Sequence, residues 1–182
     1  MTILTMNIIP NKHEQIADYL LFMWQTEDVL RACKLDLDIV WQTLVDPLPV
    51  SDEEKSKMLD WYEGLIMMMK SEGVQEKGHL QINKNMIIEL TDLHLRLQKD
   101  PKEAEYMATY YHTLPYIVEL RAKSKVKDIP EIETCFTAMY GYLLLKIQKK
   151  EISKETQAAV NQIGKLLRLL TERYKTMDQE EE

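Results

Sequence analysis

Two acids and a histidine follow one another closely in the segment MIIELTDLHLRL, residues 86–97. Glu89 and Asp92 are one helical turn apart, and His94 comes shortly after them. Carboxylates can hold Mg²⁺, which prefers hard oxygen ligands, and an imidazole can act as an acid or a base. The segment therefore presents two alternatives: a catalytic or metal-binding site, or a solvated helix face with a core histidine behind it.

The helical wheel separates these three side chains, because a helix turns about 100° per residue. The apolar stripe of the segment consists of Met86, Leu90, Leu93 and Leu97. His94 falls within about 40° of its centre, whereas Glu89 and Asp92 lie roughly 90° and 150° away. We therefore expect His94 to point into the core and the two acids to share a flank that leads to solvent.

A second acid pair, Asp60 and Glu63, lies one turn apart on the preceding predicted helix. The two pairs together resemble the ExxE…ExxD pattern of all-α nucleoside triphosphate pyrophosphohydrolases of the MazG type, which implies four carboxylates holding Mg²⁺ against a triphosphate. The first position here is Asp where the pattern has Glu, and such pairs arise easily by chance among 30 acids. A Mg²⁺-dependent pyrophosphohydrolase using Asp60, Glu63, Glu89 and Asp92 is therefore the alternative hypothesis.

Other catalytic motifs are absent from the sequence. It contains no HExxH, no CxxC, no glycine-rich phosphate loop and no GxSxG. The one Glu-x-x-His, EKGH at residues 76–79, falls in a predicted loop and does not suit a carboxylate-bridged di-iron bundle. No arginine is closely followed by a histidine, the pattern of helical HEPN-type ribonucleases. We therefore predict no catalytic residues, no resident metal and no cofactor.

An acid and a base fall on the core face of the first predicted helix. Glu27 and Arg31 lie four residues apart in the middle of its apolar stripe, and an unpaired buried charge is very costly. We predict one internal polar cluster made of Glu27, Arg31, His94, Arg121, Tyr110 and Tyr111. Two interpretations stay open: a closed network that fixes helix register, or a pocket that anchors an anionic or polar small ligand.

Composition and charge place these residues in a helical protein. The chain has 182 residues, 45% of them hydrophobic, with only 5 Gly and 6 Pro, and residues that favour helices dominate. A net charge of −7 argues against nucleic-acid binding, and Lys123, Lys125 and Lys127 are interpreted as a solvated loop. No run approaches the roughly 18 apolar residues of a membrane span. Two cysteines suggest reduced thiols, so we expect a cytoplasmic protein.

Capping and breaking signals divide the chain into about seven helices. Among them are a cap at Asp36 or Asp38, a capping box at Ser51 and Glu54, and a helix stop at Gly73. The predicted helices cover residues 12–33, 36–45, 52–72 and 81–98, a fifth helix from 101 onwards, and residues 130–149 and 153–174. Pro115 interrupts the fifth and predicts a kink near 111–115. We expect an all-α, single-domain, mostly antiparallel bundle at residues 11–176, preceded by an N-terminal arm at 1–10 and followed by a frayed acidic tail at 177–182.

The run LIMMM, residues 65–69, is apolar on every side of the third predicted helix. A central helix covered all round is the favoured interpretation. The alternative is a homodimer face formed by Trp61, Met67 and Met68, because methionine side chains adapt to varied surfaces.

Four long segments carry a family resemblance: YLLFMWQTEDVLRA, GHLQINKNMIIELTDLHLRL, YYHTLPYIVELRAKS and PEIETCFTAMYGYLLLKIQKKEIS. They resemble an uncharacterised family of helical bacterial proteins from Bacteroidetes, a domain of unknown function. The resemblance implies a cytoplasmic all-helical domain and brings no activity, substrate or catalytic residue. We therefore expect a protein that binds a small ligand or a protein partner and has no catalytic site.

Overall fold

The structure, a computed structural model, describes residues 9–124 and 128–180, and all regular elements in these ranges are helical. The elements are α1 (Ile16–Ala32), α2 (Leu37–Val40), the π-helix η1 (Trp41–Val45), α3 (Asp52–Ser71), α4 (Gln81–Leu97), α5 (Ala104–Lys123), α6 (Glu131–Ile147) and α7 (Lys154–Glu180). The all-α class is confirmed. None of the helices in the described ranges is long and apolar enough to cross a membrane.

The described residues divide into two compact units. Residues 22–84 form one, called here the α2–α3 unit, and residues 9–21 with 85–180 form the other, called the α5–α7 unit. The boundaries fall inside α1 and inside α4. The helical domain expected at 11–176 thus consists of two units, and each is described by itself below.

Local capping determines the helix ends in the α2–α3 unit. The Asp36 carboxylate accepts hydrogen bonds from the backbone N–H groups of Asp38 and Ile39 and begins α2. Ser51 and Glu54 form a capping box at the start of α3, with Ser51 N donating to Glu54 Oε2 over 3.0 Å. After α3, Gly73 takes a positive φ of 70° that suits glycine. These three boundaries agree with the sequence prediction.

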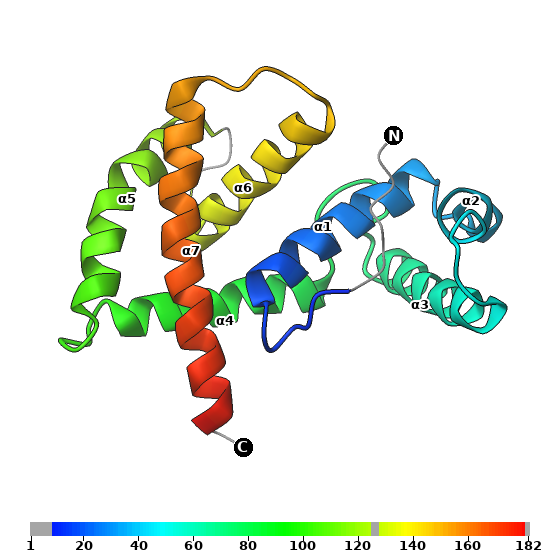
Figure 1. The fold of residues 1–182 in the computed structure, drawn as a ribbon, viewed down its shortest axis with the longest axis horizontal. Coiled ribbons are helices and arrows are strands. Elements are labelled where there is room, and N and C mark those ends of the chain that lie inside the picture. The colour runs from blue at the N-terminus through cyan, green and yellow to red at the C-terminus, as the bar shows by residue number, and fades with distance from the viewer. Residues whose placement is uncertain (1–8, 125–127, 181–182) are drawn as a thin grey trace. The chain divides into compact units, whose positions relative to one another are not determined.

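In the α5–α7 unit, α5 and α6 both pack against α7 (Figure 1). The core between them holds fully buried side chains, among them Tyr106 and Ile117 from α5 and Phe136 from α6. The helix α7 contributes Ile163 and Leu166 to the same core. Its long amphipathic face therefore organises the unit.

Two helices begin later than predicted, for different reasons. Asn11 Oδ1 accepts hydrogen bonds from the N–H groups of His13 and Glu14, but it caps a turn, and α1 begins only at Ile16. Asp100 likewise accepts from Lys102 N, and α5 begins at Ala104. Glu103 was expected inside that helix. Its two carboxylate oxygens both accept from Nε of Arg173 on α7, each over 2.8 Å, so a tertiary contact replaces the predicted local one.

Further predictions concern Pro115, the two ends of the chain and the basic loop. The helix α5 is not broken at Pro115, and its ribbon curves part-way along (Figure 1). The helix α7 continues to Glu180, past the predicted end near Tyr174. Lys123, predicted to lie in a solvated loop, is instead the exposed last residue of α5. Residues 1–8 of the expected arm, Lys125 and Lys127 of the basic loop, and residues 181–182 lie outside the described residues.

Candidate functional site: two buried polar clusters

Glu27 is the best-buried acid of the α2–α3 unit, with 1% of its surface exposed. Its Oε1 accepts hydrogen bonds from the backbone N–H of Leu80 at 2.9 Å and from Nδ2 of Asn83 at 2.6 Å. Its Oε2 lies 2.6 Å from Nδ1 of His79. We call Glu27, Arg31, His79, Leu80 and Asn83 the Glu27 cluster.

The start of α4 explains how this carboxylate is stabilised without a buried cation. The first N–H groups of a helix have no partner within the helix, and this end carries a partial positive charge. Leu80 immediately precedes α4, so its N–H points at Glu27. The next N–H, that of Gln81, donates to Glu72 over 2.6 Å. Two carboxylates thus cap one helix end.

Arg31 lies one turn after Glu27 and binds the loop between α3 and α4. Its Nη2 donates to the carbonyl of Val74 at 3.1 Å and also to that of Gly78. Its Nη1 pairs with Asp28 at 2.8 Å. Glu27 and Arg31, predicted in one polar cluster, are thus neighbouring anchors that hold the same loop.

The remaining atoms of the Glu27 cluster are also packed. The His79 ring stacks on Trp24, with centroids 4.2 Å apart and an interplanar angle of 14°. Asn83 Oδ1 is buried without a hydrogen-bond donor from the protein. Both carboxylate oxygens of Glu27 have protein groups within bonding distance, as in a network that holds the loop on α1.

His94 is the centre of a second cluster, in the α5–α7 unit, and is 1% exposed. Its Nδ1 lies 2.6 Å from the hydroxyl of Tyr106, which is fully buried. Its Nε2 lies 2.6 Å from Gln98 Nε2 and 3.3 Å from Glu131 Oε2. The ring of Tyr110 meets the imidazole edge-on at 5.0 Å. We call His94, Gln98, Tyr106, Tyr110 and Glu131 the His94 cluster.

Burial controls the protonation of this cluster. It lowers the pKa of His94, while the hydrogen bond and charge of Glu131 act in the opposite direction. Burial raises the pKa of Tyr106, and the negative charge of Glu131 adds to the shift. Burial first, and Glu131 second, raise the pKa of Tyr110 to about 12. The cluster therefore holds a neutral imidazole and protonated phenols beside one carboxylate.

Cys135 follows Glu131 by one turn of α6, and the charge of Glu131 acts on its thiol. It is fully buried and free. Burial, and then the charge of Glu131, raise the pKa of its thiol to about 12. Because the thiolate is the reactive form, Cys135 is not an activated nucleophile.

A pH dependence follows from the lowered pKa of His94. The unfolded chain takes up a proton on this residue near its ordinary pKa of about 6.5, whereas the folded chain does so only at lower pH. The unfolded state therefore binds more protons in this window. We expect the free energy of unfolding to fall as the pH drops through about 6.5.

Urea unfolding of the wild type and His94→Gln at closely spaced pH values checks this expectation. The difference between the two proteins isolates His94 from the carboxylates, which also titrate in acid. We expect the wild type to have the larger free energy of unfolding at neutral pH, and we expect its difference from His94→Gln to shrink as the pH falls. A pH-independent difference would contradict the buried, neutral state of His94.

Comparison of the chain with known proteins gives one family match. Residues 6–181 match one family model, described as a domain of unknown function (DUF4924). The chain belongs to this family. No curated protein matches the chain, and no solved structure matches it. Membership in DUF4924 confirms the resemblance to a domain of unknown function and brings no activity, substrate or catalytic residue to the clusters.

In this DUF4924 member, the residues predicted as one polar cluster have separate partners. The hydrogen bonds of Glu27 and Arg31 stay within residues 27–83, and those of His94 reach Gln98, Tyr106 and Glu131. Of the other members, Tyr110 contacts His94, whereas Tyr111 is 61% exposed. Arg121 is exposed near the end of α5.

Several members of the two clusters were missed from the sequence. The missed residues are His79, Leu80, Gln98, Tyr106 and Glu131. The position of Asn83 does indicate a buried polar side chain, because it falls near the centre of the apolar stripe of its helix, as His94 does. A polar residue on a core face indicates a partner without identifying it.

The structure does not support the pyrophosphohydrolase alternative in this DUF4924 member. The four acids of that hypothesis, Asp60, Glu63, Glu89 and Asp92, are all exposed. Glu89 accepts a hydrogen bond from the hydroxyl of Tyr174 at 3.1 Å. Across residues 9–124 and 128–180, no group of three or more His, Cys, Asp or Glu side chains is placed to hold a metal ion. The acid pairs are interpreted as solvated helix faces.

Proposed function

We propose that this protein is a non-catalytic interaction module that binds another helix through one exposed face of α5. The observation that carries the proposal is a row of apolar residues, all of them exposed. We call this row the α5 seam; its members are Ala104, Ala108, Tyr111, Pro115, Val118 and Ala122. They alternate four and three residues apart.

This spacing is the one by which helices pack side by side in coiled coils. Single exposed apolar residues are common on protein surfaces, but a continuous row indicates an interaction surface. Tyr111 and Val118, the two largest aliphatic or aromatic members, are 61% and 58% exposed. The opposite face of α5 already serves the fold, because Tyr106 and Ile117 are fully buried there.

The two polar clusters support this function better than a ligand pocket. Glu27 receives all its hydrogen bonds from the chain itself, and both ring nitrogens of His94 have protein groups within bonding distance. A ligand would have to displace these contacts. The clusters therefore support a structural role, which leaves the exposed surface as the place for function.

The α3 face suggested as a homodimer surface has weaker support than the α5 seam. Trp61 stacks on Phe22, with ring centroids 6.0 Å apart. Met67 is 64% exposed, but the exposed residues about one turn before and after it include the charged Glu63 and Lys70. The helix α3 thus offers a single exposed methionine where α5 offers a continuous row.

Thiol labelling in cells tests the proposed function. A cysteine placed in the seam by Val118→Cys should react slowly with a permeant maleimide in cells and quickly in the diluted purified protein, because a partner covers it only in cells. Met67→Cys is the matched control and should react quickly in both. The natural cysteines give little background, since Cys33 and Cys135 are buried. Equal in-cell rates at positions 118 and 67 would overturn the proposal.

A further inference from the structure

We infer that the partner of the α5 seam is the same seam on a second copy of this chain, with the two α5 helices antiparallel. This inference rests on the proposed function and names its partner. The argument comes from the sizes of the seam residues, from the charges at the two ends of α5, and from the length of the seam.

The seam is symmetric about residue 113. Ala104 and Ala122 are equally far from this point, and so are Ala108 and Val118. An antiparallel pair centred there places Ala108 of one copy opposite Val118 of the other. Each larger side chain then faces a compact one, which is how close-packed helix contacts are filled.

At the centre of the seam the same symmetry sets Tyr111 opposite Pro115. A tyrosine ring can lie flat on a compact proline ring. In a parallel pair, by contrast, Tyr111 would meet Tyr111 and Val118 would meet Val118, with Pro115 against Pro115 between them and alanine against alanine on either side. The helices would be held apart at the large residues and leave gaps at the small ones, so the sizes favour the antiparallel pair.

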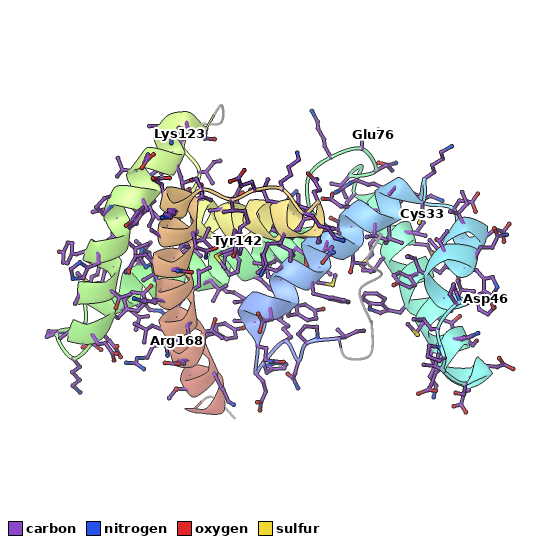
Figure 2. All side chains as sticks on the ribbon, turned by 45° about the horizontal axis from the view of Figure 1, so that its top comes forward. Cys33, Asp46, Glu76, Lys123, Tyr142 and Arg168 are labelled. Atoms are coloured by element: carbon purple, nitrogen blue, oxygen red, sulfur yellow. The ribbon has the colours of Figure 1, made fainter. Side chains whose placement is uncertain are left out.

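The charges at the ends of α5 favour the same orientation. Glu105 lies in the first turn, and Arg121 and Lys123 lie in the last turn. Lys123 is seen at the C-terminal end of α5 in Figure 2. On the helical wheel, Glu105 and Lys123 lie on the same flank of the seam, roughly 100° from its centre. Antiparallel packing brings the same flanks together, so Glu105 would approach Lys123 of the second copy.

A parallel pair would instead bring opposite flanks together, so Glu105 would not approach Lys123, and the basic Lys123 and Arg121, which lie on opposite flanks, would meet at the same end. The helix dipoles also oppose a parallel pair, because like partial charges would then meet at each end. Exposed ion pairs contribute little to affinity, about 0–1 kcal/mol each. Their role here is to select the orientation, whereas the apolar seam supplies the attraction.

The size of the contact predicts a reversible dimer. The seam runs along most of the 20 residues of α5, and a helix of this length spans about 30 Å. One helix from each copy forms a contact near or below the lower end of stable interfaces, about 1,200 Å² in total. The net charge of −7 on each chain adds repulsion that salt screens. The dimer should therefore form with rising concentration and tighten when salt is added.

Sedimentation equilibrium of the full chain tests the inference across a wide range of concentrations. We expect the wild type to change from monomer to dimer. Val118→Glu and Tyr111→Glu should weaken the dimer at least about tenfold, because each would bury a charge in the seam. Met67→Glu, the matched control on α3, should leave the equilibrium unchanged. Circular dichroism verifies that the variants are folded, and Ala122→Glu provides a second way to disrupt the seam.

Cysteine pairing tests the orientation. The double variant Ala108→Cys with Val118→Cys should form an interchain disulfide under mild oxidation, because these positions face each other in the antiparallel pair. Val118→Cys alone should form it far more slowly. Rapid crosslinking of the single variant would indicate parallel helices and would overturn the antiparallel inference.

The outcomes separate this inference from the proposed function. A wild type that stays monomeric at every concentration and salt, or a dimer unaffected by all three glutamate variants, would overturn the second copy as the partner. In that case, slow labelling of Val118→Cys in cells would still support the interaction module. Fast labelling in cells would remove both.

Discussion

Replacing Glu27 with alanine is expected to lower the free energy of unfolding by about 3–5 kcal/mol. The substitution removes the acceptor of three hydrogen bonds, from Leu80 N, Asn83 Nδ2 and His79. The N–H of Leu80 and the amide of Asn83 would stay buried without an acceptor, and each unsatisfied group costs about 1–3 kcal/mol. The loop between α3 and α4 would also lose its anchor on α1. Urea unfolding followed by circular dichroism measures the change.

Glu27→Gln is expected to cost much less than Glu27→Ala. The amide oxygen of glutamine can still accept from Leu80 and Asn83. Its NH₂ group would face His79, whose ring can accept a hydrogen bond in one of its neutral tautomers. The difference in the free energy of unfolding between the two variants therefore measures how much the retained acceptor stabilises the protein.

Asp28→Asn is the matched control for Glu27. Asp28 is the next residue on α1, and its side chain is 48% exposed in its pair with Arg31. Exposed pairs contribute about 0–1 kcal/mol, so we expect a change within that range. If Glu27→Ala were as mild as Asp28→Asn, the buried network would not hold the loop, and the structural role assigned to this cluster would be wrong.

Helix boundaries could be predicted from the sequence where the signal was local. The Ser51–Glu54 capping box, the Asp36 cap and Gly73 act through neighbours a few residues away, and the structure confirms all three. The start of α5 could not be predicted this way. Glu103 was expected to stabilise the first turn of a helix that begins at Pro101, but Arg173, distant in sequence, binds its carboxylate. A partner that is distant in sequence can replace a local interaction, and the local sequence pattern does not reveal it.

The polar clusters show a second limit of sequence reasoning. The wheel correctly placed Glu27 and His94 on buried faces. It could not assign their partners, because His79 and Leu80, which bond Glu27, lie before the start of α4 and outside its periodic pattern, and Glu131, which lies near His94, comes from another helix. The direction in which a side chain points follows from its own helix, whereas its hydrogen-bond partner depends on how helices and loops pack together. The sequence therefore identified which residues need a partner and left the partner open.

The α5 seam was missed for a related reason. Both faces of α5 carry apolar residues, for example Ile117 on the buried face and Val118 on the exposed one. Periodicity cannot distinguish them, because a helix that is apolar on most sides fits either a buried position or an interface. Only the packing of α5 against α6 and α7 shows which face remains exposed.

Replacing Tyr106 with alanine is expected to destabilise the protein by about 3–5 kcal/mol, the usual range for losing a large buried aromatic side chain. Tyr106 is fully buried in α5, and its hydroxyl lies 2.6 Å from Nδ1 of His94. The substitution therefore opens a cavity and also leaves a polar imidazole nitrogen without its partner. Chemical unfolding of the two proteins measures the loss.

Tyr106→Phe separates these two effects, because it keeps the ring and removes only the hydroxyl. We expect a loss of about 1–3 kcal/mol, the cost of leaving one buried polar atom unsatisfied. Tyr111→Phe is the matched control: Tyr111 is on the same helix and is 61% exposed, so its change should stay within about 0.5 kcal/mol. If Tyr106→Phe were equally silent, the hydrogen bond to His94 would add nothing to stability, and packing alone would account for the burial of this histidine.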